Sequence, residues 1–163
     1  LRVGIVVLEG ADAPRPVAHE GEAEPGVPAW NAVARIERAE ELRDPSIVKG
    51  VVSVSGRILY CSRDFSHLAA RGPDGLEAVR GILGVLGYRR DFLERYGGLE
   101  RTPLERAEAI DQSRIIEHDV MLRAVEFSKG YPGINEPREL ETVTSYLRED
   151  ATQQAVLQEI VGA

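Results

Sequence analysis

Three carboxylates at helical spacing are the first residues in this chain whose types and positions could do chemistry. Glu105, Glu108 and Asp111 follow one another at intervals of three residues, which places them on one face of a helix. Such a stripe could supply a general acid for proton transfer. The same spacing is more typical of a solvated helix face, so we expect these side chains to be exposed to water.

Histidine and cysteine, the other side chains that could bind a metal or act as nucleophiles, are few and scattered. His19 and His67 lie far apart, with no cysteine or carboxylate at ligand spacing, so no histidine metal site is predicted. Cys61 is the single cysteine, which rules out an internal disulfide and indicates a reducing compartment. We therefore predict a cytoplasmic protein in which Cys61 is a buried apolar residue.

The composition is that of one folded domain over residues 1–163. The 27 acidic residues exceed the 20 basic residues, which gives a net charge of −7. This balance argues against a nucleic-acid partner, whose binding surface would be basic. The longest apolar runs, such as residues 5–8, are far shorter than the ~20 residues that cross a bilayer, so no membrane partner is expected.

Strand-like and helix-like segments alternate along the chain and must position these residues. Apolar or alternating runs predict strands over residues 2–8, 30–36, 47–54, 57–61, 82–88 and 121–127. Helices are predicted over residues 90–96, from Thr102–Pro103 onward, 136–147 and 151–161. Residues 9–28 predict a flexible loop, and residues 64–79 an irregular connection. The predicted fold class is α/β, a mixed sheet with flanking helices.

Five short segments, in order between residues 39 and 140, resemble one enzyme family. They are residues 39–42 with 45–49, 59–63 (Leu-Tyr-Cys-Ser-Arg), 84–89 (Gly-Val-Leu-Gly-Tyr-Arg), 103–114 and 133–140. From about residue 36 the chain is similar to the C-terminal half of the CMP-Kdo synthetases, which are 3-deoxy-manno-octulosonate cytidylyltransferases. Residues 36–163 are thus expected to form a cytidylyltransferase-like region, the C-terminal half of a nucleotide-diphospho-sugar transferase fold.

The resemblance implies a dimeric enzyme that transfers CMP from CTP to the anomeric oxygen of a 2-keto-3-deoxy sugar acid, with Mg²⁺. Arg63 and Gln112 match family positions that face the sugar. Asp12 and Asn135 match metal-binding positions, with Glu136 as a substitute ligand. The alternatives are a surface salt bridge for Arg63, a solvated helix residue for Gln112 and a turn residue for Asn135.

The chain departs from the family pattern where the chemistry would take place. Asn135 stands in place of the family's Asp and lacks its charge, which weakens a magnesium site. Ile82 and Leu86 stand where the family has a His and a Tyr of the sugar site. The sequence contains no Gly-rich loop followed by Lys that would cradle a triphosphate.

These departures favour a degenerate, non-catalytic dimerising subunit, with no cofactor, that supports or completes an active relative. Half of such a sheet leaves an open edge, so we expect a homodimer or a heterodimer with an active cytidylyltransferase. A sugar acid is a further candidate ligand. The alternatives are a truncated or partly seen active cytidylyltransferase, which would use Mg²⁺, and an unrelated binding or scaffolding domain.

Overall fold

The computed structural model describes residues 4–7, 24, 26–128, 139–149, 151 and 154. The chain divides into two units, residues 2–130 and residues 131–163, and each is presented by itself. In the second unit, helix α6 (Glu139–Glu149) confirms the helix predicted over 136–147 for the part of that range that the structure describes. Of the helix predicted over 151–161, only residues 151 and 154 are described, and both are helical. Most of the loop predicted over 9–28 lies outside the described residues.

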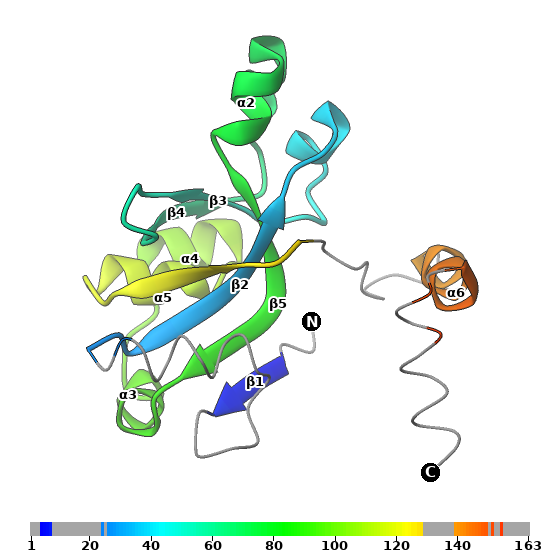
Figure 1. The fold of residues 1–163 in the computed structure, drawn as a ribbon. Helices are drawn as coiled ribbons and strands as arrows, with labels where there is room; N and C mark the ends of the chain where they lie inside the picture. Colours follow the sequence, from blue (N-terminus) through cyan, green and yellow to red (C-terminus); the bar gives the residue numbers. More distant parts are fainter. Residues whose placement is uncertain are drawn as a thin grey trace. The chain divides into compact units, whose positions relative to one another are not determined.

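Six strands of the first unit form one mixed sheet (Figure 1). They are β1 (Gly4–Val7), β2 (Ala29–Arg35), β3 (Lys49–Val52), β4 (Ile58–Ser62), β5 (Arg80–Tyr88) and β6 (Leu122–Glu126). The order is β4-β3-β5-β2-β6, and β1 lies beside β5. The pairs β1/β5 and β2/β6 are parallel, whereas β2/β5, β3/β4 and β3/β5 are antiparallel. The predicted mixed α/β sheet is confirmed.

Strand β2 lies in the interior of the sheet, between β5 and β6. This position explains why its sequence is apolar without alternation. It pairs with β5 on one side and with β6 on the other. Ala29 and Val33 pack into the main core cluster, whereas Trp30 packs on the opposite face with Val125. Every residue of β2 except Arg35 is buried, because both faces of this strand are covered.

The β3–β4 hairpin forms where the sequence predicts it, with its turn at residues 53–57. Gly56 has a φ of 80°, in the left-handed region, which a side chain at this position would disfavour. The hairpin also contacts β6, because the Ala124 N–H donates to the Gly56 carbonyl at 2.8 Å. The turn is therefore fixed to a strand more than sixty residues away in the sequence.

Three short helices follow β5 and cover one face of the sheet: α3 (Arg90–Tyr96), α4 (Pro103–Glu108) and α5 (Gln112–Glu117). The predicted start at Thr102–Pro103 is confirmed, with Thr102 as the N-cap residue and Pro103 at the first helical position. Helix α4 ends at Glu108, so it does not extend to Asp111, the third carboxylate of the predicted stripe. Ala109 adopts a left-handed conformation (φ 54°) and separates α4 from α5.

The connection predicted over 64–79 is more regular than expected. It contains the 3₁₀ helix η3 (Ser66–Arg71) and helix α2 (Pro73–Glu77), where Pro73 stands at the start of α2 rather than in a loop. Together with the 3₁₀ helix η2 (Ala39–Leu42), these elements enclose a separate apolar cluster. Its buried members are Ile36, Leu42, Phe65 and Val79.

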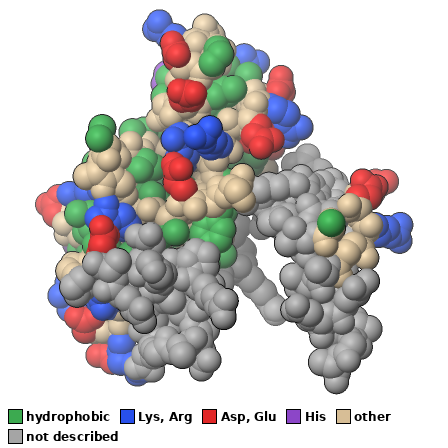
Figure 2. All heavy atoms as spheres, viewed as in Figure 1, with side chains coloured by type: hydrophobic (Ala, Val, Ile, Leu, Met, Phe, Trp, Pro, Cys, Tyr) green, Lys and Arg blue, Asp and Glu red, His purple; other side chains and the backbone are tan. Residues whose placement is uncertain are grey.

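The main core cluster lies between the sheet and helices α3 and α5. It is built from Leu86 and Tyr88 of β5, Phe92 of α3 and Ile115 of α5, with other strand residues. On the surface of the described residues, basic and acidic side chains are intermixed (Figure 2). No helix in the described ranges is both long and apolar enough to cross a bilayer.

Candidate functional site

The predicted sugar residue Gln112 is buried at the start of α5, and its side chain turns towards the sheet. Gln112 is only 7% exposed, so its interpretation as a solvated helix residue is wrong. Its Nε2 donates a hydrogen bond of 2.9 Å to Oδ1 of Asn31. A contact across 81 residues of sequence therefore joins α5 to the centre of β2.

Asn31 is a buried polar residue in an otherwise apolar strand, and sequence analysis did not single it out. It stands opposite Leu86 of β5, while Val33 stands opposite Ile82, so β5 carries two extra residues in this interval. The Asn31 Nδ2 fills the resulting bulge by donating to the carbonyls of Ala32 (2.8 Å) and Leu83 (2.9 Å). The signal in the sequence was a single amide between apolar residues.

The two apolar replacements, Ile82 and Leu86, lie on the face of the sheet that α5 covers. Leu86 is completely buried in the main core, and Ile82 packs against the same cluster. The polar group closest to them in the sheet register is Asn31. The positions where the resemblance places sugar-binding groups thus contribute apolar packing, and the neighbouring polarity comes from β2.

The predicted sugar residue Arg63 follows β4 and binds backbone carbonyls. Its guanidinium donates to the carbonyls of Glu108 (3.1 Å), Pro45 (2.7 Å) and Ala109 (3.4 Å). Its own N–H donates to the Glu108 carboxylate at 3.0 Å, which also accepts from Ser62 Oγ at 3.2 Å. Within the described ranges Arg63 makes no ion pair by its guanidinium, so the surface salt bridge considered above is wrong.

Arg63 and Gln112 thus meet at one corner of the fold, the turn between α4 and α5. Arg63 holds the carbonyls of the last residue of α4 and of Ala109, and Gln112 begins the next helix. The structure brings the two predicted sugar residues to the same turn. Arg63 fixes the backbone of this turn, and Gln112 connects it to the sheet.

The carboxylate stripe is divided by this corner and does not form a solvated face. Glu105 is buried, and its carboxylate accepts two hydrogen bonds from the Arg114 guanidinium, at 2.8 Å and 2.5 Å. It accepts a third from Arg101 at 3.0 Å. The hydrogen bond from Arg114 is the main reason that the pKa of Glu105 falls to about 2. A carboxyl group that stays ionised cannot act as a general acid near neutral pH, so Glu105 is a structural ion-pair residue.

Lys49 is a second cation held by backbone carbonyls. Its Nζ donates to the carbonyls of Asp44 and Ile47, each at 2.8 Å, and to that of Arg63. The side chain is completely buried, and this desolvation lowers the pKa of Lys49. Lys49 therefore organises the loop that precedes β3.

The predicted metal residues Asp12 and Asn135, and the substitute Glu136, lie outside the described residues. Among the residues that are described, no three His, Cys, Asp or Glu side chains gather in a way that could hold a metal ion. Cys61 is buried as predicted, and burial raises the pKa of its thiol to about 12. The thiol is therefore protonated and unreactive near neutral pH.

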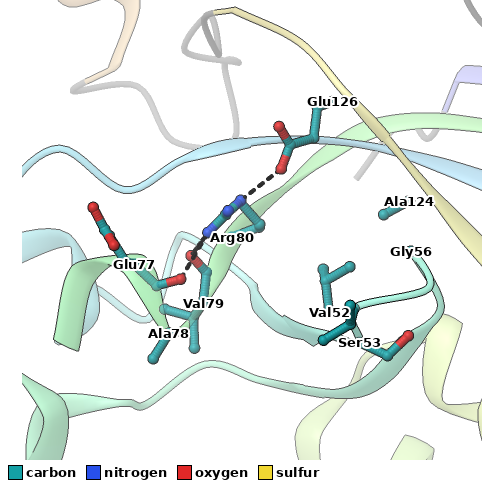
Figure 3. A pocket seen from close by; sticks show the side chains of 10 residues that line it. Val52, Ser53, Gly56, Glu77, Ala78, Val79, Arg80, Ala124 and Glu126 are labelled. Atoms are coloured by element: carbon teal, nitrogen blue, oxygen red, sulfur yellow. Dashed lines mark hydrogen bonds and ion pairs between the residues drawn. The ribbon is translucent and has the colours of Figure 1, made fainter. Parts of the chain in front are cut away.

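A pocket of about 380 Å³ lies between the hairpin turn and the start of β5, bordered by Val52, Ser53, Val79 and Ala124 (Figure 3). Arg80 spans its rim and pairs with Glu126 at 2.9 Å while it donates to the Glu77 carbonyl at 2.8 Å. The guanidinium is thus engaged by protein groups, and the lining shows no arrangement of catalytic side chains.

The mixed sheet with its covering helices has a nucleotidyltransferase-type fold. A solved structure of CMP:2-keto-3-deoxy-manno-octonic acid synthetase complexed with CTP matches it with a TM-score of 0.70 and 29% identity, over 85% of this chain and 57% of that chain. Curated 3-deoxy-manno-octulosonate cytidylyltransferases are similar in sequence. The one from Chlorobium phaeobacteroides is 36% identical over 66% of this chain and 43% of its own length. The one from Syntrophotalea carbinolica is 33% identical over 77% of this chain and 53% of its own length.

This chain belongs to the 3-deoxy-manno-octulosonate cytidylyltransferase family, as the sequence motifs predict. It spans about half the length of the curated relatives it matches. No family model matches the chain. Family membership excludes a domain of unrelated ancestry.

Proposed function

We propose that this chain is a non-catalytic dimerising subunit of the cytidylyltransferase family, which supports or completes an active relative. The observation that carries the proposal is the packing of Leu86 and Ile82. Leu86 is completely enclosed in the main core and Ile82 packs against it, at the positions where the family motif has a Tyr and a His. Two apolar side chains in a core cannot form hydrogen bonds to a sugar acid.

Two further features support the same proposal. The guanidinium of Arg63 donates to three backbone carbonyls, two of them in the α4–α5 corner, so its N–H groups are already engaged by the protein. Asn135 offers a neutral carbonyl oxygen where the family motif has a carboxylate, and Mg²⁺ prefers charged oxygen ligands. Each change weakens a part that transfer of CMP would need.

The dimerisation part of the proposal is supported by the edge strand β4. This strand is at one end of the described sheet order, and its sequence Ile-Leu-Tyr-Cys-Ser carries no charge. Leu59 and Tyr60 are 47% and 40% exposed. An uncharged, apolar edge is a typical site for pairing with another chain, here a second copy or an active relative in a cytoplasmic setting.

Calorimetric titration of CTP with Mg²⁺ into the purified chain tests the proposal. We expect no heat of binding from the folded chain. The full-length Chlorobium phaeobacteroides relative, titrated under the same conditions, serves as the control for reagents and conditions. Saturable binding of CTP by this chain alone would show that the proposal is wrong.

An active cytidylyltransferase is the second candidate, favoured by the guanidinium of Arg63, which no described carboxylate pairs with. Such a charge is suited to a substrate carboxylate. Under this alternative Mg²⁺ would be held by Asp12 with Asn135 or Glu136. Release of pyrophosphate from CTP in the presence of a 2-keto-3-deoxy sugar acid would establish it.

A further inference from the structure

The turn of the β3–β4 hairpin is bound to the outer edge of β6 at a point where two arginines face each other. Arg57, which directly precedes β4, forms an antiparallel bridge with Arg123 of β6. The hydrogen bond beside this bridge runs from the Ala124 N–H to the Gly56 carbonyl, one residue away on each strand. Arg57 and Arg123 are therefore a pair of the non-hydrogen-bonded kind, in which the two side chains start closest together.

This contact needs a counter-charge, because like charges directly opposite each other destabilise paired strands. Among the described residues Arg57 has no ion-pair partner, and its Nε is enclosed without a hydrogen bond. Glu24 supplies the counter-charge to Arg123. Its two carboxylate oxygens accept hydrogen bonds from Nε and Nη2 of Arg123, each at 2.6 Å. This two-point geometry is a strong form of the contact between arginine and a carboxylate.

Arg123 also holds the backbone of the hairpin turn. Its Nη1 donates to the Ser55 carbonyl. A Cβ atom on Gly56 would lie only 2.9 Å from the same nitrogen, so the guanidinium lies directly against the turn. One arginine of β6 therefore binds both the hairpin turn and Glu24.

Glu24 is itself anchored at the end of β5. Arg89, which directly follows β5, donates from its guanidinium to the carbonyls of Glu24 at 3.1 Å and Val27 at 2.8 Å. Its N–H donates to the Pro28 carbonyl at 2.9 Å. The residues that lead into β2 are thus fixed to β5, and the Glu24 carboxylate extends this anchorage to β6 and the hairpin.

We propose that the Glu24–Arg123 ion pair is an ionic latch that keeps the hairpin turn docked on β6 and thereby controls association through the hairpin. The inference rests on the proposed function, in which the exposed apolar residues of this hairpin contact another chain. Release of Glu24 leaves two opposed arginines without a counter-charge, so the turn separates from β6 while the hairpin stays folded. A hairpin that is no longer docked must be ordered again on association, which weakens binding.

Backbone amide exchange separates undocking of the turn from unfolding of the hairpin. The Ala124 N–H reports docking, because its acceptor belongs to the turn. The Ser53 N–H, which is bonded across the turn to the Arg57 carbonyl at 2.8 Å, reports the hairpin itself. We expect Glu24→Gln to speed Ala124 exchange about tenfold and to leave Ser53 exchange unchanged.

Glu41→Gln is the matched control, because it makes the same chemical change in the ion pair with Arg38 and should change neither rate. Arg57→Gln combined with Glu24→Gln removes the opposed charge and should return Ala124 exchange most of the way to the wild-type rate. Equal Ala124 exchange in the wild-type chain and Glu24→Gln would overturn the latch. A double variant that exchanges as fast as Glu24→Gln alone would contradict its electrostatic basis.

Salt tests the latch in the unmodified chain. Sodium chloride at about 1 M should speed Ala124 exchange relative to Ser53 exchange, because it screens the ion pair. An unchanged ratio of the two rates would count against the latch even if Glu24→Gln failed to fold.

Light scattering over a concentration series measures the consequence for association. We expect Glu24→Gln to weaken dimerisation about fivefold, and Glu41→Gln to leave it unchanged. Equal dimerisation of wild type and Glu24→Gln, despite faster Ala124 exchange, would refute control of association by the latch but not the proposed function. A monomeric wild-type chain would contradict the dimerisation part of the proposed function and the control of association, whereas the exchange rates would still decide whether the latch holds the turn.

Discussion

At the level of single residues, Glu105 is the charged group on which the helical layer most depends. It is almost completely buried, yet it is ionised, because Arg114 and Arg101 supply charge and hydrogen bonds. Arg114 also lies over the Tyr96 ring at 4.9 Å, so the ion pair is packed as well as bonded. Glu105 of α4 thus pairs with Arg114 of α5, and the Arg114 guanidinium in turn packs on Tyr96 of α3.

Removal of the Glu105 charge should destabilise the fold in a pH-dependent way. The folded pKa of about 2 lies below the ordinary value of 4.5, so the stabilisation is complete above about pH 4.5 and is lost as the pH falls towards 2. We expect Glu105→Gln to lower the free energy of unfolding by about 3 kcal/mol at pH 7 and by much less at pH 2.5. Urea unfolding at both pH values measures the difference.

The matched control is Glu126→Gln, in the ion pair with Arg80. The Glu126 side chain is 60% exposed, so its loss should cost less than about 1 kcal/mol. A Glu105→Gln effect that is equally small at neutral pH would contradict the structural role of the buried pair.

The residues of the candidate site could be predicted only in part. Arg63 and Gln112 were found from sequence motifs, and the structure places both at the α4–α5 corner. Asn31 was not found, because its role arises from a bulge in β5 that only the pairing register reveals. The acceptors of Arg63 are backbone carbonyls, which carry no signature in the sequence.

At the level of elements, the corner between α4 and α5 decides where Gln112 points. It depends on Ala109, whose left-handed conformation costs a residue with a Cβ about 1 kcal/mol. The guanidinium of Arg63 holds the two carbonyls around this residue. The strained residue is thus kept in place by the side chain of Arg63, which directly follows β4.

Glycine at position 109 should relieve this strain. We expect Ala109→Gly to raise the free energy of unfolding by about 1 kcal/mol, because glycine adopts positive φ without steric cost. Ala107→Gly, two residues earlier and inside α4, is the matched control and should lower the free energy of unfolding by about 1 kcal/mol. Destabilisation by both substitutions would show that Ala109 is not strained in solution.

The strands and most helices were predictable because their signals are local. Residues 82–88 and the Thr102–Pro103 helix start confirm this, since apolar runs and caps act over a few residues. Helix α2 and the break at Ala109 were not predicted. Their causes are contacts with distant elements, such as the bonds from Arg63, which outweigh local preference.

At the level of the whole molecule, the exposed large apolar residues are concentrated on one hairpin. Of the four in the described ranges, Val54, Leu59 and Tyr60 belong to the β3–β4 hairpin, and Leu140 lies on α6. A neutral edge strand beside such residues favours association with another chain.

We expect this chain to be a dimer by light scattering at micromolar concentration. Leu59→Lys should convert it to a monomer, because a charge on the edge strand opposes pairing. Leu140→Lys makes the same chemical change at another exposed apolar residue and should leave the dimer intact. A monomeric wild-type chain would contradict the proposed association.

Trp30 gives this molecule a built-in optical probe. It is the only tryptophan, it is completely buried, and the guanidinium of Arg89 lies 5.3 Å from its ring. As the neighbour of Asn31 in β2, it points to the opposite face of the sheet. Intrinsic fluorescence therefore monitors the central strand from the side away from Gln112. Rupture of β2 should expose the indole to water and shift its emission to the red.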